Sequence, residues 1–598
     1  MFRKPLILGL FALAVAAPAG AAPTTLMPGV TYERAVQFTP HGPVAIHVVR
    51  GPRPTGLYAL RPTLSNEAIV GLERVTAMQK RLAPSATMVG VNGDFYADSG
   101  RPSGVLMRDG IVESPPFGDR SSLGATPDGA LDVRRVEFFG TWRGLGQRRA
   151  LNDMNQAPGA NGISLFTSAY GPATPPQSGV VEAVIQPLPP TTPNTDLAGP
   201  VVAVSGAGGT AIPQGGAVLV ARGTAAARLA EEAPVGTTVA LRLILRPEWT
   251  GITQAVGGGP VLVRAGGPVF RAQEAFTTSQ LSPRAPRTAV GQTADGRVLM
   301  VVTDGRRPGY SVGMTNFELA QTLVRLGAVT ASAFDGGGSS SLAFDGKLLN
   351  RPSDPGGERP VSNALQLVYY GVFASAVTPV ISPNGDGVEE RQRPLGYKVV
   401  RPSVVTATLT APDGTVAFAE TEAPKPPGTY EVAFPPVPPP PADPAAPPPP
   451  PVAPAEGRWQ LLVRATDDQG QASQAVQAFT VNNTLGFAAL SRRSLVLRPR
   501  GKASISAGVT LTRPARMVVT VETASGVKIS TIAARRAEAG RFRASWSGRV
   551  RRSLVYGGMY RLRFRANSEL GIVELATKPF RVIRAAPVKK KKKAKPDS

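Results

Sequence analysis

The chain has 598 residues, 42% of them hydrophobic, with 66 lysines and arginines against 41 aspartates and glutamates. It has no cysteine, which excludes disulfides, thiolate nucleophiles and cysteine-based zinc sites, and its two histidines argue against a Ser-His-Asp triad or a multi-histidine metal centre. Chemistry in this chain must therefore rest on carboxylates, hydroxyls, arginines and backbone N–H groups.

The N-terminal residues have the pattern of a secretory signal. Arg3 and Lys4 precede an apolar run from Leu6 to Ala17, and small residues suited to cleavage follow it. A membrane anchor is the alternative, but the run is short for a membrane span. We expect residues 1–22 to be a cleaved signal peptide and the protein to be secreted or held at the cell surface.

Residues 24–375 read as one catalytic domain of the α+β class, built on a large mixed sheet. Short β segments dominate, and two helical patterns interrupt them. The first helix is expected after Ser65-Asn66. The second begins at Thr315, where Glu318 completes a capping box, and Gly327 is expected to end it.

The rest of the chain reads as all-β. Residues 376–485 and 486–584 each show short alternating strands, which predicts two immunoglobulin-like sandwiches. Residues 435–454 are mostly proline and alanine and are expected to form an extended insertion within the first of them. Residues 585–598 form a lysine-rich tail that we expect to be disordered.

The strongest chemical pattern is a strand–helix–strand unit with an acid after each strand. Arg297–Thr303 is followed by Asp304, and Val329–Phe334 is followed by Asp335. If the helix at Thr315 makes a right-handed crossover, the two strands are parallel and both aspartates emerge at one sheet edge, where ligands bind. This predicts Asp304 and Asp335 as a carboxylate pair.

A glycine-rich loop follows the second acid. Gly336, Gly337 and Gly338 allow close approach of the backbone and can turn several N–H groups toward an anion such as phosphate, with Ser339 adding a hydroxyl. The alternative is a flexible spacer. Because core-type strands lie on both sides of the loop, we favour a binding site.

Two further segments carry candidate ligand contacts. Asn92-Gly93-Asp94 ends a hydrophobic strand and is followed by two aromatic residues that could stack on a sugar, although the same tripeptide is also a common turn. Arg287 opens a later strand and could contact a phosphate bidentately, the alternative being a surface ion pair.

Seven segments, in order, resemble the phosphodiester glycosidase family, which includes the lysosomal uncovering enzyme. They are Asn92-Gly93-Asp94-Phe95, Gly257-Gly258-Gly259-Pro260, Arg287-Thr288-Ala289, Asp304-Gly305-Arg306, Gly313-Met314-Thr315 with Glu318-Leu319-Ala320, Asp335 to Ser340, and Asn350 with Glu358-Arg359-Pro360. The resemblance spans residues 30–373. Many relatives carry glycine where Asp94 stands, so Asp94 is the weaker catalytic candidate.

The resemblance implies hydrolysis of a sugar-1-phosphodiester bond. Asp335 would be the nucleophile or would stabilise the oxocarbenium ion, and Asp304 would activate water or orient another group. Arg287, Arg359 and the glycine-loop N–H groups would hold the phosphate, with Asn350 among the substrate contacts. The separation of the two carboxyl groups would predict retention or inversion.

The expected partner is a phosphate-linked glycan or an anionic wall polymer. Residues 486–598 contain 27 lysines and arginines against 5 aspartates and glutamates, which favours contact with an anionic polymer or membrane surface. Few aromatic residues alternate with these charges, so nucleic acid is not expected. A non-catalytic cell-surface adhesin that binds glycan is the alternative to an enzyme.

No cofactor is expected, with one reservation at the start of the second domain. Asn384 and Asp386, with Glu389 or Glu390, could bind calcium, but the spacing departs from that of an EF-hand. We therefore expect Ser382–Gly387 to form a tight turn.

Overall fold

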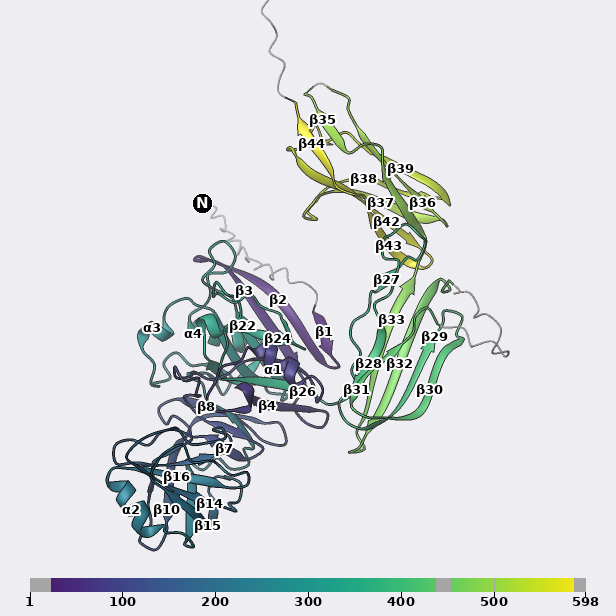
Figure 1. Cartoon of the computed structure of the whole chain (residues 1–598). Coiled ribbons are helices and arrows are strands. Elements are labelled where there is room, and N and C mark those ends of the chain that lie inside the picture. The colour runs from purple at the N-terminus through teal and green to yellow at the C-terminus, as the bar shows by residue number, and fades with distance from the viewer. Residues whose placement is uncertain (1–22, 437–452, 500, 586–598) are drawn as a thin grey trace, which may run out of the picture. The chain divides into compact units, whose positions relative to one another are not determined.

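The computed structural model describes residues 23–436, 453–499 and 501–585 (Figure 1). The predicted signal peptide, most of the proline-rich insertion and the lysine-rich tail lie outside these residues. The chain divides into two compact units, Met1–Tyr370 and Gly371–Ser598. They are described separately below.

The expected α+β catalytic domain on a large mixed sheet is wrong. Half of the structure is strand and 7% is helix, and unit 1 is built from several sheets. The strands that precede Asp304 and Asp335 run in the same direction but are not hydrogen-bonded to each other. The strand Arg287–Thr293, which precedes both of them in the chain, lies between them. It is antiparallel to each of the two strands.

Two sheets of unit 1 lie face to face. The first has the order β1 (Thr24–Met27), β2 (Val30–Thr39), β3 (Gly42–Gly51), β22 (Val298–Thr303), β21 (Arg287–Thr293), β23 (Ala328–Phe334), β19 (Val261–Arg264), β20 (Gly267–Pro268). The second has the order β25 (Lys347–Leu348), β24 (Leu342–Phe344), β5 (Thr87–Asn92), β26 (Asn363–Tyr369), β4 (Tyr58–Leu64). A Cβ added at Gly51 would lie 2.2 Å from Leu367 Cδ2, which shows how closely the sheets pack.

A helix covers the outer face of each of these sheets. Leu319 and Leu323 of α4 (Asn316–Arg325) share a buried core with residues of β3, β22 and β23. The predicted capping box of Thr315 and Glu318 is present. Helix α1 (Val75–Leu82) packs on the second sheet and begins later than predicted, because residues 65–67 form a separate 3-10 turn.

The remaining strands of unit 1 form a third sheet and an outer lobe, which Figure 1 shows with α2 (Thr224–Glu232) at the end away from β1–β3. The third sheet has the order β7 (Ile111–Ser114), β6 (Leu106–Arg108), β18 (Gln254–Val256), β8 (Ser121–Ala125), β9 (Leu131–Arg135). The lobe sheet has the order β11 (Arg149–Leu151), β10 (Glu137–Arg143), β17 (Thr238–Arg246), β15 (Asp196–Ser205), β14 (Val180–Ile185), β16 (Ala217–Arg222), β13 (Ile163–Thr167), β12 (Asp153–Met154). A short helix, α3 (Thr278–Leu281), lies between β20 and β21.

Unit 2 contains two β cores. The first is formed by β27 (Val380–Ile381), β33 (Ala472–Val481), β32 (Gly457–Asp467), β29 (Ser403–Thr410) and β30 (Val416–Lys425), with the pair β28 (Leu395–Val399) and β31 (Gly428–Val432). The second contains the three-stranded sheet β34 (Leu485–Leu490), β36 (Ile505–Leu511), β39 (Gly540–Trp546). Opposite it lie β35 (Ser494–Leu497), β44 (Phe580–Arg584), β42 (Gly558–Ser568), β37 (Ala515–Thr523), β38 (Lys528–Ala537) and β43 (Gly571–Ala576), and β40 (Arg549–Val550) pairs with β41 (Ser553–Leu554).

Candidate active site

Three predicted site residues lie at one edge of the first sheet. Strand β21 is antiparallel to both β22 and β23, with Arg287 opposite Thr303 and Thr288 opposite Phe334. Strands β22 and β23 therefore run in the same direction, and Asp304 and Asp335 follow their ends at that edge. Because β21 separates them, the two strands are about 10 Å apart, twice the usual spacing of neighbouring strands.

The Asp304 carboxylate is the buried centre of a hydrogen-bond network. Its Oδ2 lies 2.9 Å from His47 Nε2 and accepts from the Tyr310 hydroxyl at 2.7 Å. Its Oδ1 accepts from Asn350 Nδ2 at 3.1 Å and from the Arg351 N–H at 3.0 Å. Burial raises the pKa of Asp304, but the hydrogen bond and charge interaction with His47 and the Tyr310 hydroxyl outweigh it, so the pKa is lowered. Both oxygens are engaged, which suits a structural anchor better than a base.

Asp335 is instead brought together with Asp94. The Asp335 N–H donates to the Gly93 carbonyl oxygen at 3.0 Å, so the loops after β23 and β5 are joined directly. Burial raises the pKa of Asp94 to about 7, and the negative charge of Asp335 adds to the increase. Burial also raises the pKa of Asp335 to about 6, although the Ser339 hydroxyl and the charge of Arg359 oppose it. Asp94, the weaker catalytic candidate from the sequence, thus belongs to the pair of acids whose pKa values are raised.

Glycines hold the Asp94 carboxyl group in place. Its oxygens accept from the N–H groups of Gly104 at 2.6 Å and of Phe95 at 2.8 Å. A Cβ added at Gly257 would lie 2.4 Å from Asp94 Oδ2, and one at Gly258 would lie 2.6 Å from Phe334 Cδ1. The Gly-Gly-Gly-Pro segment between β18 and β19 therefore allows the backbone to pass directly beside the acid.

Arg120, which the sequence analysis missed, carries a positive charge beside both acids. Its guanidinium lies over the rings of Phe276, Phe95 and Phe117, at 4.4, 5.0 and 5.2 Å from their centroids. Its Nε–H donates to the Ala275 carbonyl oxygen at 3.2 Å. The charge of Arg120 lowers the pKa of Asp94 and of Asp335 against the effect of burial. The only sequence signal was an arginine directly before the buried strand β8.

Two further guanidinium groups lie against the glycine loop. A Cβ added at Gly338 would lie 2.1 Å from Arg359 Nη2, and one at Gly337 would lie 3.1 Å from Arg306 Nη2. Arg359 is oriented by Asp354, with Nε 2.7 Å from Oδ2. The glycines are therefore required so that cationic groups can approach the backbone beside Asp335.

The glycine loop does not form the predicted anion nest. Residues 337–339 form a single 3-10 turn, in which the N–H groups of Ser339 and Ser340 donate back to Gly336 and Gly337. The Gly337 N–H donates to the Pro286 carbonyl oxygen at 2.9 Å. These N–H groups are already used within the protein, so the cationic side chains are better placed to hold a phosphate.

Arg287 is also not placed to bind phosphate. Its guanidinium is buried and donates to the carbonyl oxygens of Gln280, Leu281, Pro283 and Met314 at 2.8–3.2 Å. Burial, and then the charge of Arg306, lower the pKa of Arg287 to about 10. Arg287 thus holds the end of α3 and the residues after it against the site.

Two predicted substrate contacts are scaffold residues. Asn92 Nδ2 donates to the Asp335 carbonyl oxygen at 2.8 Å, and its Oδ1 accepts from the Thr288 hydroxyl at 2.8 Å and the Ser341 N–H at 3.1 Å. Asn350 Nδ2 links Asp304 to the carbonyl oxygen of Ser340. Both amides fix the loop that carries Asp335.

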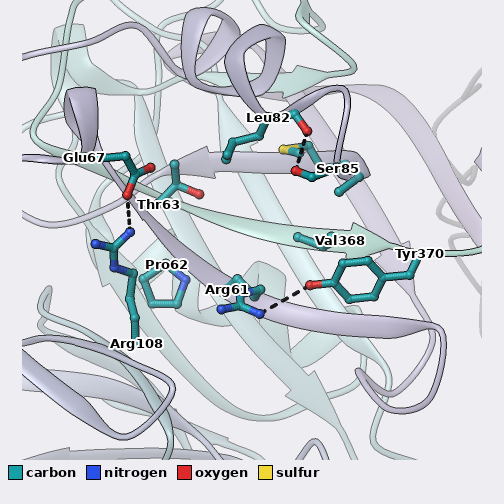
Figure 2. A pocket seen from close by; sticks show the side chains of 11 residues that line it. Arg61, Pro62, Thr63, Glu67, Leu82, Ser85, Arg108, Val368 and Tyr370 are labelled. Carbon is teal, nitrogen blue, oxygen red and sulfur yellow. Dashed lines mark hydrogen bonds and ion pairs between the residues drawn. The ribbon is translucent and has the colours of Figure 1, made fainter. Parts of the chain in front are cut away.

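A narrow crevice lies on the Asp94 side and has no room for a water molecule. It is lined by Asp94, Ser103, Gly104, Phe117, Arg120, Ser121, Ser122, Gly257 and Gly258. A different pocket, shown in Figure 2, contains neither acid of the pair. We therefore place the candidate active site at Asp94 and Asp335.

Comparison with known proteins identifies a family domain in this chain. Residues 194–368 match the model of the phosphodiester glycosidase family. The chain therefore carries a phosphodiester glycosidase domain. The matched range contains Asp304, Asp335 and Arg359, whereas Asp94 and Arg120 precede it. The match covers 175 of the 598 residues.

Three individual proteins that resemble this chain give less information about its function than the family match does. The prophage protein YomE of Bacillus subtilis is uncharacterised and is 36% identical over 99 residues, which cover 17% of this chain and 15% of YomE. A hypothetical protein from Synechocystis has 26% identity and a TM-score of 0.51, with 59% of this chain and 64% of that one covered. The catalytic domain of zebrafish N-acetylglucosamine-1-phosphodiester alpha-N-acetylglucosaminidase has 13% identity and a TM-score of 0.30, over 59% and 84% of the two chains, too distant to support an argument.

The described residues contain neither a metal-binding cluster nor a membrane-spanning helix. In residues 23–436, 453–499 and 501–585, no group of three or more His, Cys, Asp or Glu side chains is arranged to hold a metal ion. Over the same residues, no helix is long and apolar enough to cross a membrane.

The proposed calcium residues take part in a tight turn. Asp386 Oδ1 accepts from the Val388 N–H at 2.9 Å, and Glu390 accepts from the N–H groups of Gly385 and Gly387. Asn384 Oδ1 accepts from the Asp386 N–H at 3.0 Å. These oxygens thus serve the backbone of the Ser382–Gly387 loop, as expected for the turn alternative.

Proposed function

We propose that the protein is an exported hydrolase that cleaves a sugar-1-phosphodiester bond in a phosphate-linked glycan. The observation that carries the proposal is the pairing of Asp94 and Asp335, two buried carboxyl groups with raised pKa values, beside Arg120 and Arg359. Perturbed acids at one point, next to cations that fit a phosphate, favour catalysis over a binding-only role.

The leaving group determines what the two acids must do. A phosphate monoester leaves readily from an anomeric carbon, so protonation by an acid matters less than stabilisation of the oxocarbenium-like transition state. We assign this stabilisation to ionised Asp335. Asp94 takes a proton from the attacking water. The water oxygen forms a new bond to C1 while the bond between C1 and the phosphate oxygen breaks, and that oxygen leaves with the phosphate. The products are a free sugar and a phosphate monoester.

The arginines provide charge for the phosphate. Arg359 and Arg306 lie against the loop after Asp335, and Arg120 lies beside both acids. A guanidinium can bind two phosphate oxygens at once and is always charged, so these groups can hold the phosphodiester and stabilise the charge that it gains. Asp304 keeps the role of a structural anchor in this mechanism.

Export and a wall-polymer partner complete the proposal. Export rests on the basic and apolar pattern of the first 22 residues. The partner rests on the excess of 27 basic over 5 acidic residues from position 486 onward. Both would place the enzyme where phosphate-linked glycans occur.

The test is hydrolysis of two small substrates, UDP-N-acetylglucosamine and the methyl phosphodiester of N-acetylglucosamine-1-phosphate. We expect wild type to release sugar from at least one of them, and Asp335→Asn and Asp94→Asn to release little. Equal release by wild type and both variants would contradict the assignment. If no protein releases sugar, a panel of other glycosyl-1-phosphodiesters decides whether the reaction class itself is wrong.

A further inference from the structure

The second core of unit 2 has a groove on the outer face of its three-stranded sheet. The groove has a volume of about 520 Å³ and is lined by residues of β34, β36 and β39. It is far in sequence from the catalytic residues, and the mechanism does not use it. We infer that this groove binds a strand of phosphate-bearing glycan, so that the polymer is held by a site separate from the one that cuts it.

The floor of the groove is opened by a glycine. In the register of β36 and β39, Gly508 is opposite Arg543 and Thr510 is opposite Arg541. A Cβ at Gly508 would lie 3.6 Å from Arg543 Cγ, so the missing side chain leaves space directly beside the arginine. Residues 541 and 543 point to the same face of the strand, about 7 Å apart. The groove thus presents two guanidinium groups along one line.

An aromatic side chain forms the opposite wall. Phe487 of β34 lines the groove, is 53% exposed and has a φ of +58°. The β34–β36 register shifts between Gly486 and Ala489, at the same place. A positive φ in a bulky residue is costly, and a bulge often re-aims a side chain. This local strain therefore presents an exposed ring to the groove.

The Ser382–Gly387 turn fixes that wall. Asp386 Oδ2 accepts from the Phe487 N–H at 2.9 Å, and Asn384 Nδ2 donates to the Leu485 carbonyl oxygen at 3.2 Å. A Cβ at Gly486 would lie 2.5 Å from Asn384 Nδ2. The turn that sequence analysis singled out thus holds the strand on which Phe487 stands.

The charges of the groove are left without acidic partners. In the part of the chain that the structure describes, no acidic side chain forms an ion pair with Arg541 or Arg543. Elsewhere in the same core, Arg561 and Arg563 both pair with Glu522. Unpaired arginines in a concave site complement a polyanion rather than stabilise the fold.

These features together match a glycan that carries phosphate. The guanidinium groups can each bind a phosphate bidentately, the Phe487 ring can stack on a sugar face, and Ser506 and Thr510 add hydroxyl groups to the lining. A groove accepts a linear chain, whereas a layer of lipid headgroups is flat. The inference rests on the proposed function only for the choice of polymer, a chain linked through sugar-1-phosphodiesters.

The experiment measures binding of the full chain to poly(N-acetylglucosamine-1-phosphate), with Asp335→Asn in every protein so that the polymer is not consumed. The groove variant combines Arg541→Gln and Arg543→Gln, and a further variant is Phe487→Ala. The matched control combines Arg516→Gln and Arg581→Gln, which removes the same charge from exposed positions on the other sheet. Melting temperatures confirm that all variants are folded.

We expect the groove variant to raise the Kd at least tenfold and to reduce the salt dependence of binding, while the control changes the Kd less than twofold. Phe487→Ala should weaken binding several-fold. Equal weakening by the groove and control variants, equal affinity for an unphosphorylated chitin oligosaccharide, or the same arginine dependence on phosphatidylglycerol vesicles would each overturn the inference. Hydrolysis of the small substrates by wild type is scored separately, so failure of the proposed reaction is not mistaken for failure of the groove.

Discussion

Two aspartates at the same sheet edge have opposite environments. Asp304 is surrounded by donors that keep it ionised and hold it still, and its pKa is lowered. Asp335 has fewer compensating contacts and a pKa raised to about 6, and it shares its surroundings with Asp94, whose pKa is raised to about 7. An acid at the end of a strand is therefore assigned a role by its hydrogen-bond partners, and position alone does not distinguish an anchor from a catalytic group.

The largest expected effect is loss of activity in Asp335→Asn. The substitution removes the charge assigned to the transition state while keeping the shape of the side chain, so kcat should fall about a thousandfold. The melting temperature should not fall, because a buried charge with a raised pKa is lost. Steady-state kinetics and thermal denaturation check both outcomes, and a normal kcat would remove Asp335 from the mechanism.

Asp94→Asn should change both the rate of catalysis and the pH dependence of stability. We expect kcat to fall about a hundredfold or more, since the group that accepts the proton of water is lost. A carboxyl group with a raised pKa favours the folded state most at low pH, and that contribution disappears as pH rises through about 7. The melting temperature of Asp94→Asn relative to that of wild type should therefore be higher at pH 8 than at pH 5. The opposite trend would show that Asp94 is stabilised as an anion.

Asp304→Asn should act mainly on stability. The amide cannot accept from all the donors that surround the carboxylate, so we expect a loss of about 2–4 kcal/mol in the free energy of unfolding. Because the pKa of Asp304 is lowered in the fold, its contribution is present at neutral pH and is lost as pH falls into the acid range. Chemical denaturation at pH 7 and at about pH 3 should show a smaller difference from wild type at the lower pH, which lies below the usual pKa of an aspartate.

The sequence predicted the shared edge but not the pairing of the acids. Two strands in the same direction and a capped helix are local patterns, and the sequence of residues 297–335 carries them. It does not show that β21 lies between the strands, since that is a matter of long-range pairing. His47, which anchors Asp304, is 257 positions away along the chain.

The contacts of the arginines are also long-range and could not be predicted from the sequence. Arg120 contacts Phe117 in its own loop, but its other two ring partners, Phe95 and Phe276, come from distant loops that no sequence spacing links to it. The sequence of the glycine loop likewise did not show that N–H groups of residues 337–340 donate to carbonyl oxygens within the protein, because the partner of Gly337, the carbonyl oxygen of Pro286, is distant in the chain. Arg287 was expected at the ligand because it opens a strand at the edge, yet the carbonyl groups of the neighbouring segment take its donors.

A smaller effect is expected from Gly257→Ala. Its Cβ would lie 2.4 Å from Asp94 Oδ2, so the carboxyl group must shift and kcat/KM should fall about tenfold. Gly159→Ala is the matched control, because a Cβ there meets nothing within 4 Å. If both variants keep full activity, the position of Asp94 does not matter to the reaction.

The most direct test of the central claim, that Asp94 and Asp335 act as the catalytic pair, is the pH dependence of kcat/KM in wild type and Asp94→Asn. The proposed mechanism needs both acids ionised, so wild-type activity should rise with pH through limbs near 6 and 7. Asp94→Asn should lose the limb near 7 and keep the limb near 6 at a much lower rate. A profile of Asp94→Asn that retains both limbs would show that Asp94 is not the titrating base and would contradict the catalytic pair.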